Sequence, residues 1–115
     1  MNLVVDTNIV HYFLGGNQRL VRVVKGFDLL IPFVVEIELL SYPFINRKEE
    51  NSIKRFLDDC LIVDLNQTMK METISLRRAY GLKVPDALVA STALYYNAPL
   101  LSADKGFKKV KELNF

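Results

Sequence analysis

Apolar and polar positions alternate along the chain in blocks whose lengths distinguish strands from helices. Short runs of β-prone apolar residues, such as Leu3-Val4-Val5, are typical of buried strands in a parallel sheet. These runs predict strands at residues 3–5, 27–31, 61–65 and 100–102. Helix signals occupy the segments between them, with asparagines at predicted starts and glycines at predicted ends. The predicted helices cover residues 7–14, 17–26, 33–44, 46–59, 68–80 and 84–97.

The alternation of strands with helices predicts the α/β class with a largely parallel sheet. No internal repeat, linker or low-complexity segment interrupts it, so we expect a single domain over residues 1–115. The helix at residues 33–44 is the most apolar and is therefore expected to be largely buried. A last helical turn and a possible edge strand at residues 113–115 complete the prediction.

The composition is that of an ordinary globular protein, with 50% hydrophobic and 24% charged residues. No apolar run approaches the roughly 20 residues needed to span a bilayer. The N-terminus also lacks the basic and then apolar pattern of a signal peptide. These observations predict a cytoplasmic protein with no membrane association.

The chain contains one cysteine, Cys60, and one histidine, His11. An intramolecular disulfide is therefore excluded, and a cysteine-based zinc site and most nucleophilic catalysis by histidine or cysteine are disfavoured. The formal net charge is only +2, but basic residues are clustered, and phosphate contacts require local rather than overall positive charge. Any catalysis is thus expected to depend on carboxylates.

Four acidic residues stand where a solvated acid is not expected: Asp6 after the first strand, Glu38 in the apolar helix, Asp86 in a first helical turn, and Asp104 after the fourth strand. Each one alone is compatible with a helix cap, an ion pair or a turn. Together in one cleft they would repel one another, and a hard cation such as Mg²⁺ or Mn²⁺ would relieve that repulsion.

Periodicity leaves the choice between two acids open in the predicted helix at residues 33–44. Glu36 and Glu38 point about 200° apart on a helix, so periodicity alone does not choose between them. Beside Asp6, the Thr7 hydroxyl and the Asn8 amide are predicted to cap the following helix.

Four segments resemble one family: VVDTN at residues 4–8, IELL at 37–40, PDALVASTAL at 85–94 and LLSADKGF at 100–107. In this order they resemble the PIN-domain ribonucleases, and among those the VapC-type toxins of prokaryotic toxin–antitoxin pairs. The resemblance implies a three-layer α/β/α fold with a mostly parallel central sheet of four or five strands. It also selects Glu38, because the family's acid directly precedes a leucine.

The resemblance further implies metal-dependent endonucleolytic hydrolysis of RNA. Mg²⁺ or Mn²⁺ would be held by Asp6, Glu38, Asp86 and Asp104, and a metal-activated water would attack phosphorus. Thr7 and Asn8 would orient these carboxylates, and Ser102, where the family often has threonine or asparagine, would orient Asp104 or a water. The basic residues nearest to the acidic motifs in sequence are candidates for RNA contacts: Arg77, Arg78, Lys83 and Lys105.

Partners also follow from the resemblance. A toxin of this kind is held in check by a cognate antitoxin and commonly forms a homodimer. Tyr42, Phe44 and Phe56 are candidates for either interface, with closure of a small core as the alternative.

Three other functions are compatible with parts of the sequence. A PIN-like module could bind RNA or protein without cutting, although the complete acidic set argues against it. A phosphatase or phosphotransferase could use Asp6, but Asn8 stands where a second aspartate is expected. A PIN nuclease of RNA processing or DNA repair is the third alternative. The small size of the chain favours the toxin over this alternative.

Overall fold

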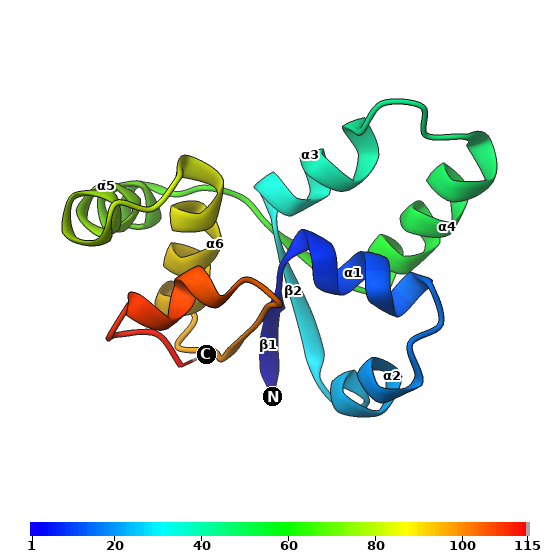
Figure 1. The fold of residues 1–115 in the computed structure, drawn as a ribbon, viewed down its shortest axis with the longest axis horizontal. Coiled ribbons are helices and arrows are strands. Elements are labelled where there is room, and N and C mark those ends of the chain that lie inside the picture. The colour runs from blue at the N-terminus through cyan, green and yellow to red at the C-terminus, as the bar shows by residue number, and fades with distance from the viewer. Residues whose placement is uncertain (115) are drawn as a thin grey trace.

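The computed structural model describes residues 1–114, in which strands and helices alternate along the chain (Figure 1). The strands are β1 (Asn2–Val5), β2 (Asp28–Pro32), β3 (Leu61–Val63) and β4 (Leu100–Leu101). The α-helices are α1 (Thr7–Leu14), α2 (Gln18–Val24), α3 (Phe33–Ser41), α4 (Arg47–Asp58), α5 (Gln67–Tyr80) and α6 (Val84–Tyr95). A 3₁₀ helix, η1 (Lys105–Lys109), follows β4.

The central sheet has the order β3-β2-β1-β4, and every pair of neighbouring strands is parallel. Val4 in β1 is paired with Leu30 in β2 and with Leu100 in β4. The first strand of the chain is therefore central in the sheet, with Val4 and Val5 almost fully buried. This arrangement confirms the predicted α/β class and its parallel sheet.

Helices cover both faces of the sheet and complete the three layers. Figure 1 shows α5 and α6 together on one side of β1 and β2, and α1, α2 and α4 on the other. Val35 and Leu39 of α3 and Ala90 of α6 are completely buried and join these layers to the apolar strands. Among residues 1–114, no helix is long and apolar enough to cross a membrane.

The cap of α1 differs from the prediction. Asp6, rather than Thr7 or Asn8, is the N-cap residue, and its Oδ1 accepts the Ile9 N–H at 3.2 Å. The cap lies one position earlier because Asp6 has extended backbone angles, whereas Thr7 and Asn8 already belong to the helix.

The apolar helix also differs from the prediction in length and burial. It ends at Ser41 because Tyr42 takes an extended conformation before Pro43. Only Val35 and Leu39 of α3 are buried, and Ile37 is 56% exposed. The prediction of a largely buried helix is wrong because α3 packs through one face only.

The predicted C-terminal edge strand does not form over residues 113–114, and residue 115 lies outside the described part of the chain. One backbone hydrogen bond joins this segment to the sheet, from Leu100 N–H to the Asn114 carbonyl at 2.8 Å. Since β4 has only two residues, it offers too short an edge for a further strand.

Candidate functional site

A pocket of about 160 Å³ lies where β1 ends and α1 begins. Its walls come from the segment after β1, from α3, from the first turns of α6 and from the segment after β4. The lining residues are Asp6, Thr7, Asn8, Glu38, Pro85, Asp86, Val89 and Asp104. The structure thus brings the four acids singled out in the sequence into one pocket, which we call the carboxylate pocket.

Asp6 is the most buried of the four acids, with only 9% of its surface exposed. Its carboxylate accepts hydrogen bonds from the Ile9 N–H and from the Ser102 hydroxyl. Burial raises the pKa of Asp6, the two hydrogen bonds oppose this, and the negative charges of Asp104 and Glu38 raise it further. The two hydrogen bonds thus fix the orientation of the Asp6 carboxylate. They do not fully offset the cost of burying its negative charge, so its pKa remains raised.

Asp86 lies in the first turn of α6, which begins after Lys83 and has Pro85 near its start. Lys83 occupies the N-cap position and makes no side-chain cap, so Asp86 is not a plain helix cap. Burial is the largest cause of the raised pKa of Asp86, followed by the charges of Asp104, Asp6 and Glu38, while Lys83 lowers it. The acids therefore act on one another electrostatically.

Glu38 reaches the carboxylate pocket from α3, whereas Glu36 does not line it. The Thr7 hydroxyl donates a hydrogen bond of 2.9 Å to Glu38 Oε1. This contact joins the first turn of α1 to α3 across 31 positions of sequence. Thr7 therefore orients Glu38 in the structure.

Asp104 caps η1, and its Oδ1 accepts the Gly106 N–H at 2.8 Å. Its own backbone N–H donates to Ser102 Oγ at 3.0 Å. Ser102 donates in turn to Asp6, so one hydroxyl links two of the acids. The sequence pointed to Ser102 as a partner of Asp104 or of a water but missed its contact with Asp6.

The predicted basic residues lie outside the carboxylate pocket. Arg77 and Arg78 line a separate groove between α5 and α6, and Arg77 Nε donates to the Leu82 carbonyl at 3.1 Å. Lys83 directly precedes α6, and Lys105 begins η1 next to Asp104. Lys83 and Lys105 thus lie close in sequence to Asp86 and Asp104, whereas Arg77 and Arg78 belong to a different groove.

Two lining residues, Pro85 and Val89, were not singled out in the sequence. They are four positions apart on α6 and flank Asp86 on the same side of the helix. Helical spacing from Asp86 could have found Val89, and direct adjacency to Asp86 could have found Pro85.

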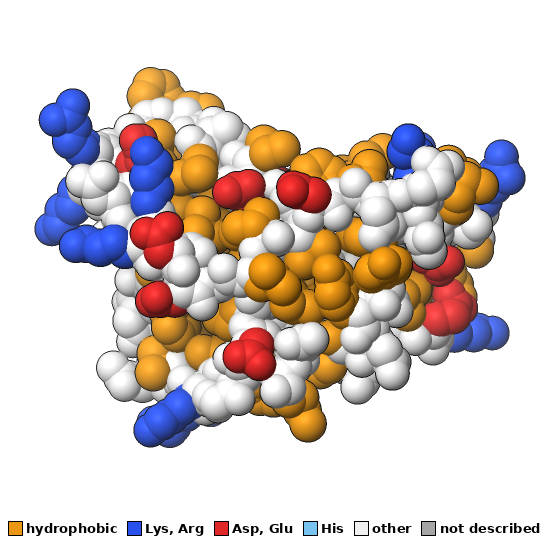
Figure 2. Space-filling model, turned by 180° about the vertical axis from the view of Figure 1, so that it is seen from behind, with side chains coloured by type: hydrophobic (Ala, Val, Ile, Leu, Met, Phe, Trp, Pro, Cys, Tyr) orange, Lys and Arg blue, Asp and Glu red, His pale blue; other side chains and the backbone are white. Residues whose placement is uncertain are grey.

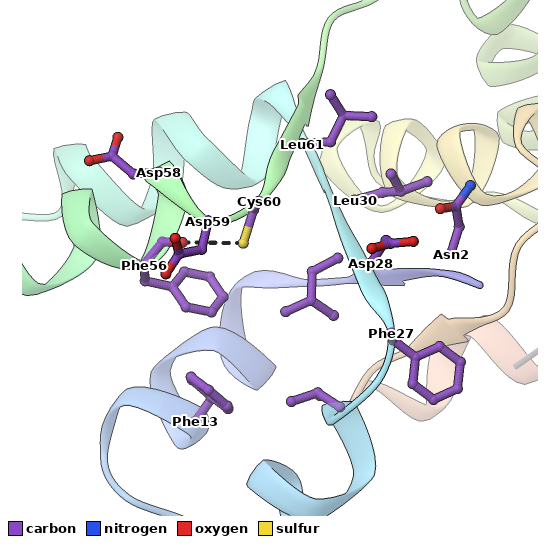
Figure 3. A pocket seen from close by; sticks show the side chains of 12 residues that line it. Asn2, Phe13, Phe27, Asp28, Leu30, Phe56, Asp58, Asp59, Cys60 and Leu61 are labelled. Atoms are coloured by element: carbon purple, nitrogen blue, oxygen red, sulfur yellow. Dashed lines mark hydrogen bonds between the residues drawn. The ribbon is translucent and has the colours of Figure 1, made fainter.

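Another pocket, of about 650 Å³, lies near the amino ends of β1, β2 and β3 and is lined by none of these four acids (Figure 3). Phe13 and Phe56 form part of its wall, and Cys60 donates its thiol to the Phe56 carbonyl there. Burial raises the pKa of Cys60 to about 11, which keeps the thiol protonated and unreactive. Cys60 is therefore no candidate for a catalytic nucleophile.

The carboxylates of the carboxylate pocket offer oxygen donors, which hard divalent metals such as Mg²⁺ prefer. Within residues 1–114, no three His, Cys, Asp or Glu side chains are arranged so that they could hold a metal ion by themselves. Mg²⁺, however, usually keeps several waters and needs only one or two direct carboxylates. Four acids around one pocket, two with a raised pKa, fit a hydrated hard cation.

Comparison with known families gives a match to the PIN domain over residues 3–113. The chain belongs to the PIN-domain family. PIN domains are generally nucleases. No curated protein sequence matches the chain.

Solved structures share this PIN fold over almost their whole length. A chain of the toxin–antitoxin complex from Klebsiella pneumoniae has a TM-score of 0.84 and 21% identity, covering 96% of this chain and 94% of that one. VapBC2 from Rickettsia felis, bound to a DNA fragment from its promoter, has a TM-score of 0.83 and 23% identity, covering 98% and 96%. DNA-bound VapBC from Salmonella typhimurium has a TM-score of 0.84 and 11% identity, covering 99% and 96%.

Proposed function

We propose that this PIN domain is an endoribonuclease that hydrolyses RNA phosphodiester bonds with Mg²⁺ or Mn²⁺ at the carboxylate pocket. The observation that carries the proposal is the convergence of Asp6, Glu38, Asp86 and Asp104 from four separate segments on a pocket of about 160 Å³. Burial, followed by the mutual repulsion of the acids, raises the pKa of Asp6 and Asp86. Acids that served only solubility would be spread apart and exposed, so this arrangement favours a functional site.

The four acids would hold the cation, directly or through water. When bound, the cation would neutralise charge at the phosphate and make water a stronger nucleophile at neutral pH. The Ile9 N–H and the Ser102 hydroxyl keep the two oxygens of Asp6 in place, and Thr7 keeps Glu38 in place. Preorganisation of this kind lowers the cost of assembling the site in the transition state.

RNA contacts are assigned to cations around the carboxylate pocket. Lys83 acts electrostatically on Asp86, and Lys105 follows Asp104 directly. Arg77 and Arg78 line the groove between α5 and the start of α6. Positive charge at these positions would attract the RNA backbone towards an otherwise acidic pocket.

We further propose that the nuclease is the toxin of a VapBC-type toxin–antitoxin pair in the cytoplasm. The similarity to chains of toxin–antitoxin complexes supports this role, and the carboxylate pocket offers an antitoxin a site for a basic side chain. The chain is proposed to form a homodimer as well.

A protein partner is supported by exposed apolar surface. Figure 2 shows apolar side chains gathered across the middle of one face of the molecule, with Lys and Arg towards its ends. Phe44 is 100% exposed and has a positive φ of 67°. Closure of the core is thus wrong as an explanation of Phe44, whereas Tyr42 and Phe56 do pack against the core.

The test is cleavage of RNA by the purified chain in Mg²⁺, Mn²⁺ or EDTA, beside the variant Asp6→Asn/Asp86→Asn. We expect metal-dependent cleavage by the wild type and none by the variant, since asparagine keeps the shape but removes the charge. Equal cleavage by both proteins would refute the assigned site. No cleavage by either protein on structured and unstructured RNAs, with bound antitoxin removed, would favour a binding module that does not cut.

A further inference from the structure

The pocket of about 650 Å³ in Figure 3, which we call the amino-end pocket, lies at the opposite end of the strands from the carboxylate pocket. Its walls come from α1, from the end of α2 and the start of β2, and from the end of α4. None of its described lining residues belongs to the carboxylate pocket. The volume is within the range of about 300–1,000 Å³ that is usual for ligand sites.

Aromatic side chains form much of the apolar wall of this pocket. Phe13 of α1 and Phe56 of α4 pack with their ring centroids 5.4 Å apart and their planes tilted by 50°. Figure 3 shows these two rings on one side of the pocket and Phe27 on the other. All three residues are half-buried, so part of each ring is accessible to a ligand. The face of an aromatic ring attracts cations and also packs against alkyl chains.

The charged residues of the amino-end pocket are all acidic. Asp28, Asp58 and Asp59 line it, and none of the described lining residues is Lys, Arg or His. The Asp28 carboxylate lies 3.6 Å from the Met1 ammonium, whereas Asp58 and Asp59 form no ion pair within residues 1–114. The formal net charge of the chain is +2, so the negative charge is a local property of this pocket.

Two of these acids stand at an electrostatically unfavourable place. Helix α4 ends at Asp58, and Asp59 is its C-cap residue. The C-terminus of a helix carries partial negative charge, so cations are stabilising there and carboxylates are not. Arg55 is basic in the last turn of α4 but does not line the pocket. A cation bound in the pocket would therefore relieve the repulsion between the two carboxylates and the helix end.

We propose that the amino-end pocket binds a small organic polycation of the aliphatic polyamine class. Its ammonium groups would lie at Asp58 and Asp59, and its methylene groups against Phe13 and Phe56. The acids select a cation, and the apolar wall selects an organic one, because a hydrated inorganic ion gains nothing from apolar surface. A polyamine matches both features, since short methylene chains separate its charges. The proposal is independent of the nuclease, because it requires neither metal nor RNA.

The test is titration of the full chain with spermidine in EDTA, with calorimetry for the affinity and NMR for the location. We expect amide shifts around Phe13, Phe56 and Asp59 to follow a single-site curve. Nuclear Overhauser effects should join spermidine methylene protons to the phenylalanine rings. Hexaamminecobalt(III) has the charge of spermidine but no methylene groups, so it should bind this pocket more weakly.

Each half of the recognition has its own variant. Asp59→Asn removes one exposed carboxylate and should weaken spermidine binding about two- to fivefold. Phe13→Leu keeps an apolar side chain but removes the ring, and should also weaken binding about two- to fivefold. The matched controls are Asp64→Asn and Phe44→Leu, which change an exposed acid and an exposed ring outside the pocket and should leave the affinity unchanged. Circular dichroism would verify that every variant is folded.

Four results would overturn the inference. Equal losses in Asp59→Asn and Asp64→Asn would show attraction to surface charge in general. Equal affinity for spermidine and hexaamminecobalt(III) would show that the apolar wall takes no part. Amide shifts confined to the carboxylate pocket, and lost in Asp6→Asn/Asp86→Asn, would place the polyamine at the other acids. Shifts around Asp59 that depend on protein concentration and not on spermidine would make the pocket an interface between copies of the chain.

Discussion

The hydroxyl of Ser102 donates a hydrogen bond to the carboxylate of Asp6, although 96 positions separate the two residues in sequence. The contact exists because β4 is paired with β1, which places the segments after both strands side by side. The same hydroxyl accepts the Asp104 N–H. Ser102 therefore couples the orientation of the most buried acid to the loop that carries another.

Ser102→Ala should shift the pH dependence of cleavage. The hydrogen bond from Ser102 lowers the pKa of Asp6 against the effect of burial, so its loss raises that pKa. The acid limb of the pH–rate profile should therefore move to higher pH. Cleavage should fall roughly tenfold at acidic pH and change little at alkaline pH. The measurements are kcat/KM against pH and titration of the Asp6 carboxyl by carbon NMR. Ser102→Thr keeps the hydroxyl and should behave as wild type; an identical shift in both variants would contradict the account.

Asp6→Asn and Asp86→Asn should stabilise the metal-free protein at neutral pH. In the folded state both pKa values lie above the ordinary 3.8, so the folded chain holds these protons more tightly than the unfolded chain does. The contribution of these two groups to the free energy of unfolding is thus highest below pH 3.8. It falls as the pH rises from there through the raised pKa values. Each variant should raise Tm by roughly 2–5 °C in EDTA, measured by circular dichroism.

The metal provides the control for this stability prediction. Mg²⁺ or Mn²⁺ should raise the Tm of the wild type and have less effect on either variant, because a ligand of the folded state stabilises it. Asp64→Asn removes an exposed acid that does not line the carboxylate pocket and should change neither Tm nor its metal response. A wild-type Tm that is insensitive to both metals would argue against a cation site.

Glu38→Gln and Glu36→Gln form a matched pair on one helix. Glu38 lines the carboxylate pocket and accepts the Thr7 hydroxyl, whereas Glu36 does neither. The glutamine amide keeps the hydrogen-bond acceptor but removes the charge, so Glu38→Gln should reduce kcat/KM about 10–100-fold. Glu36→Gln should cleave RNA like the wild type. Equal losses in both would show that net charge, not the pocket, determines the effect.

Leu39→Ala tests the packing of the helix that carries Glu38. Leu39 is completely buried in the core, so its truncation should lower the free energy of unfolding by about 2–5 kcal/mol, measured in urea. Ile37→Ala on the exposed face of the same helix should cost less than about 1 kcal/mol. A similar loss for both variants would mean that α3 packs more deeply than the structure shows.

Local patterns in the sequence were sufficient for the α/β class, the parallel sheet and the elements that carry the acids. A strand such as Leu3–Val5 is specified by its own apolar run, and the end of α5 is specified by Gly81, which adopts the left-handed conformation there. Asp6, Glu38, Asp86 and Asp104 could likewise be singled out, because each stands at a strand end or in an apolar helix. Such features depend on neighbours within a few residues.

Burial and pairing between distant segments could be decided only by the tertiary structure. Composition predicted a buried α3, yet Ile37 is exposed to solvent because, within residues 1–114, no element covers that side of the helix. The Ser102–Asp6 and Thr7–Glu38 contacts follow from strand order and helix packing, which periodicity does not encode. The groove that Arg77 and Arg78 line exists because α5 packs against α6 along a particular part of each helix. The sequence by itself determined which residues could act, and three-dimensional packing determined which of them meet, because contact depends on the assembly of all the elements at once.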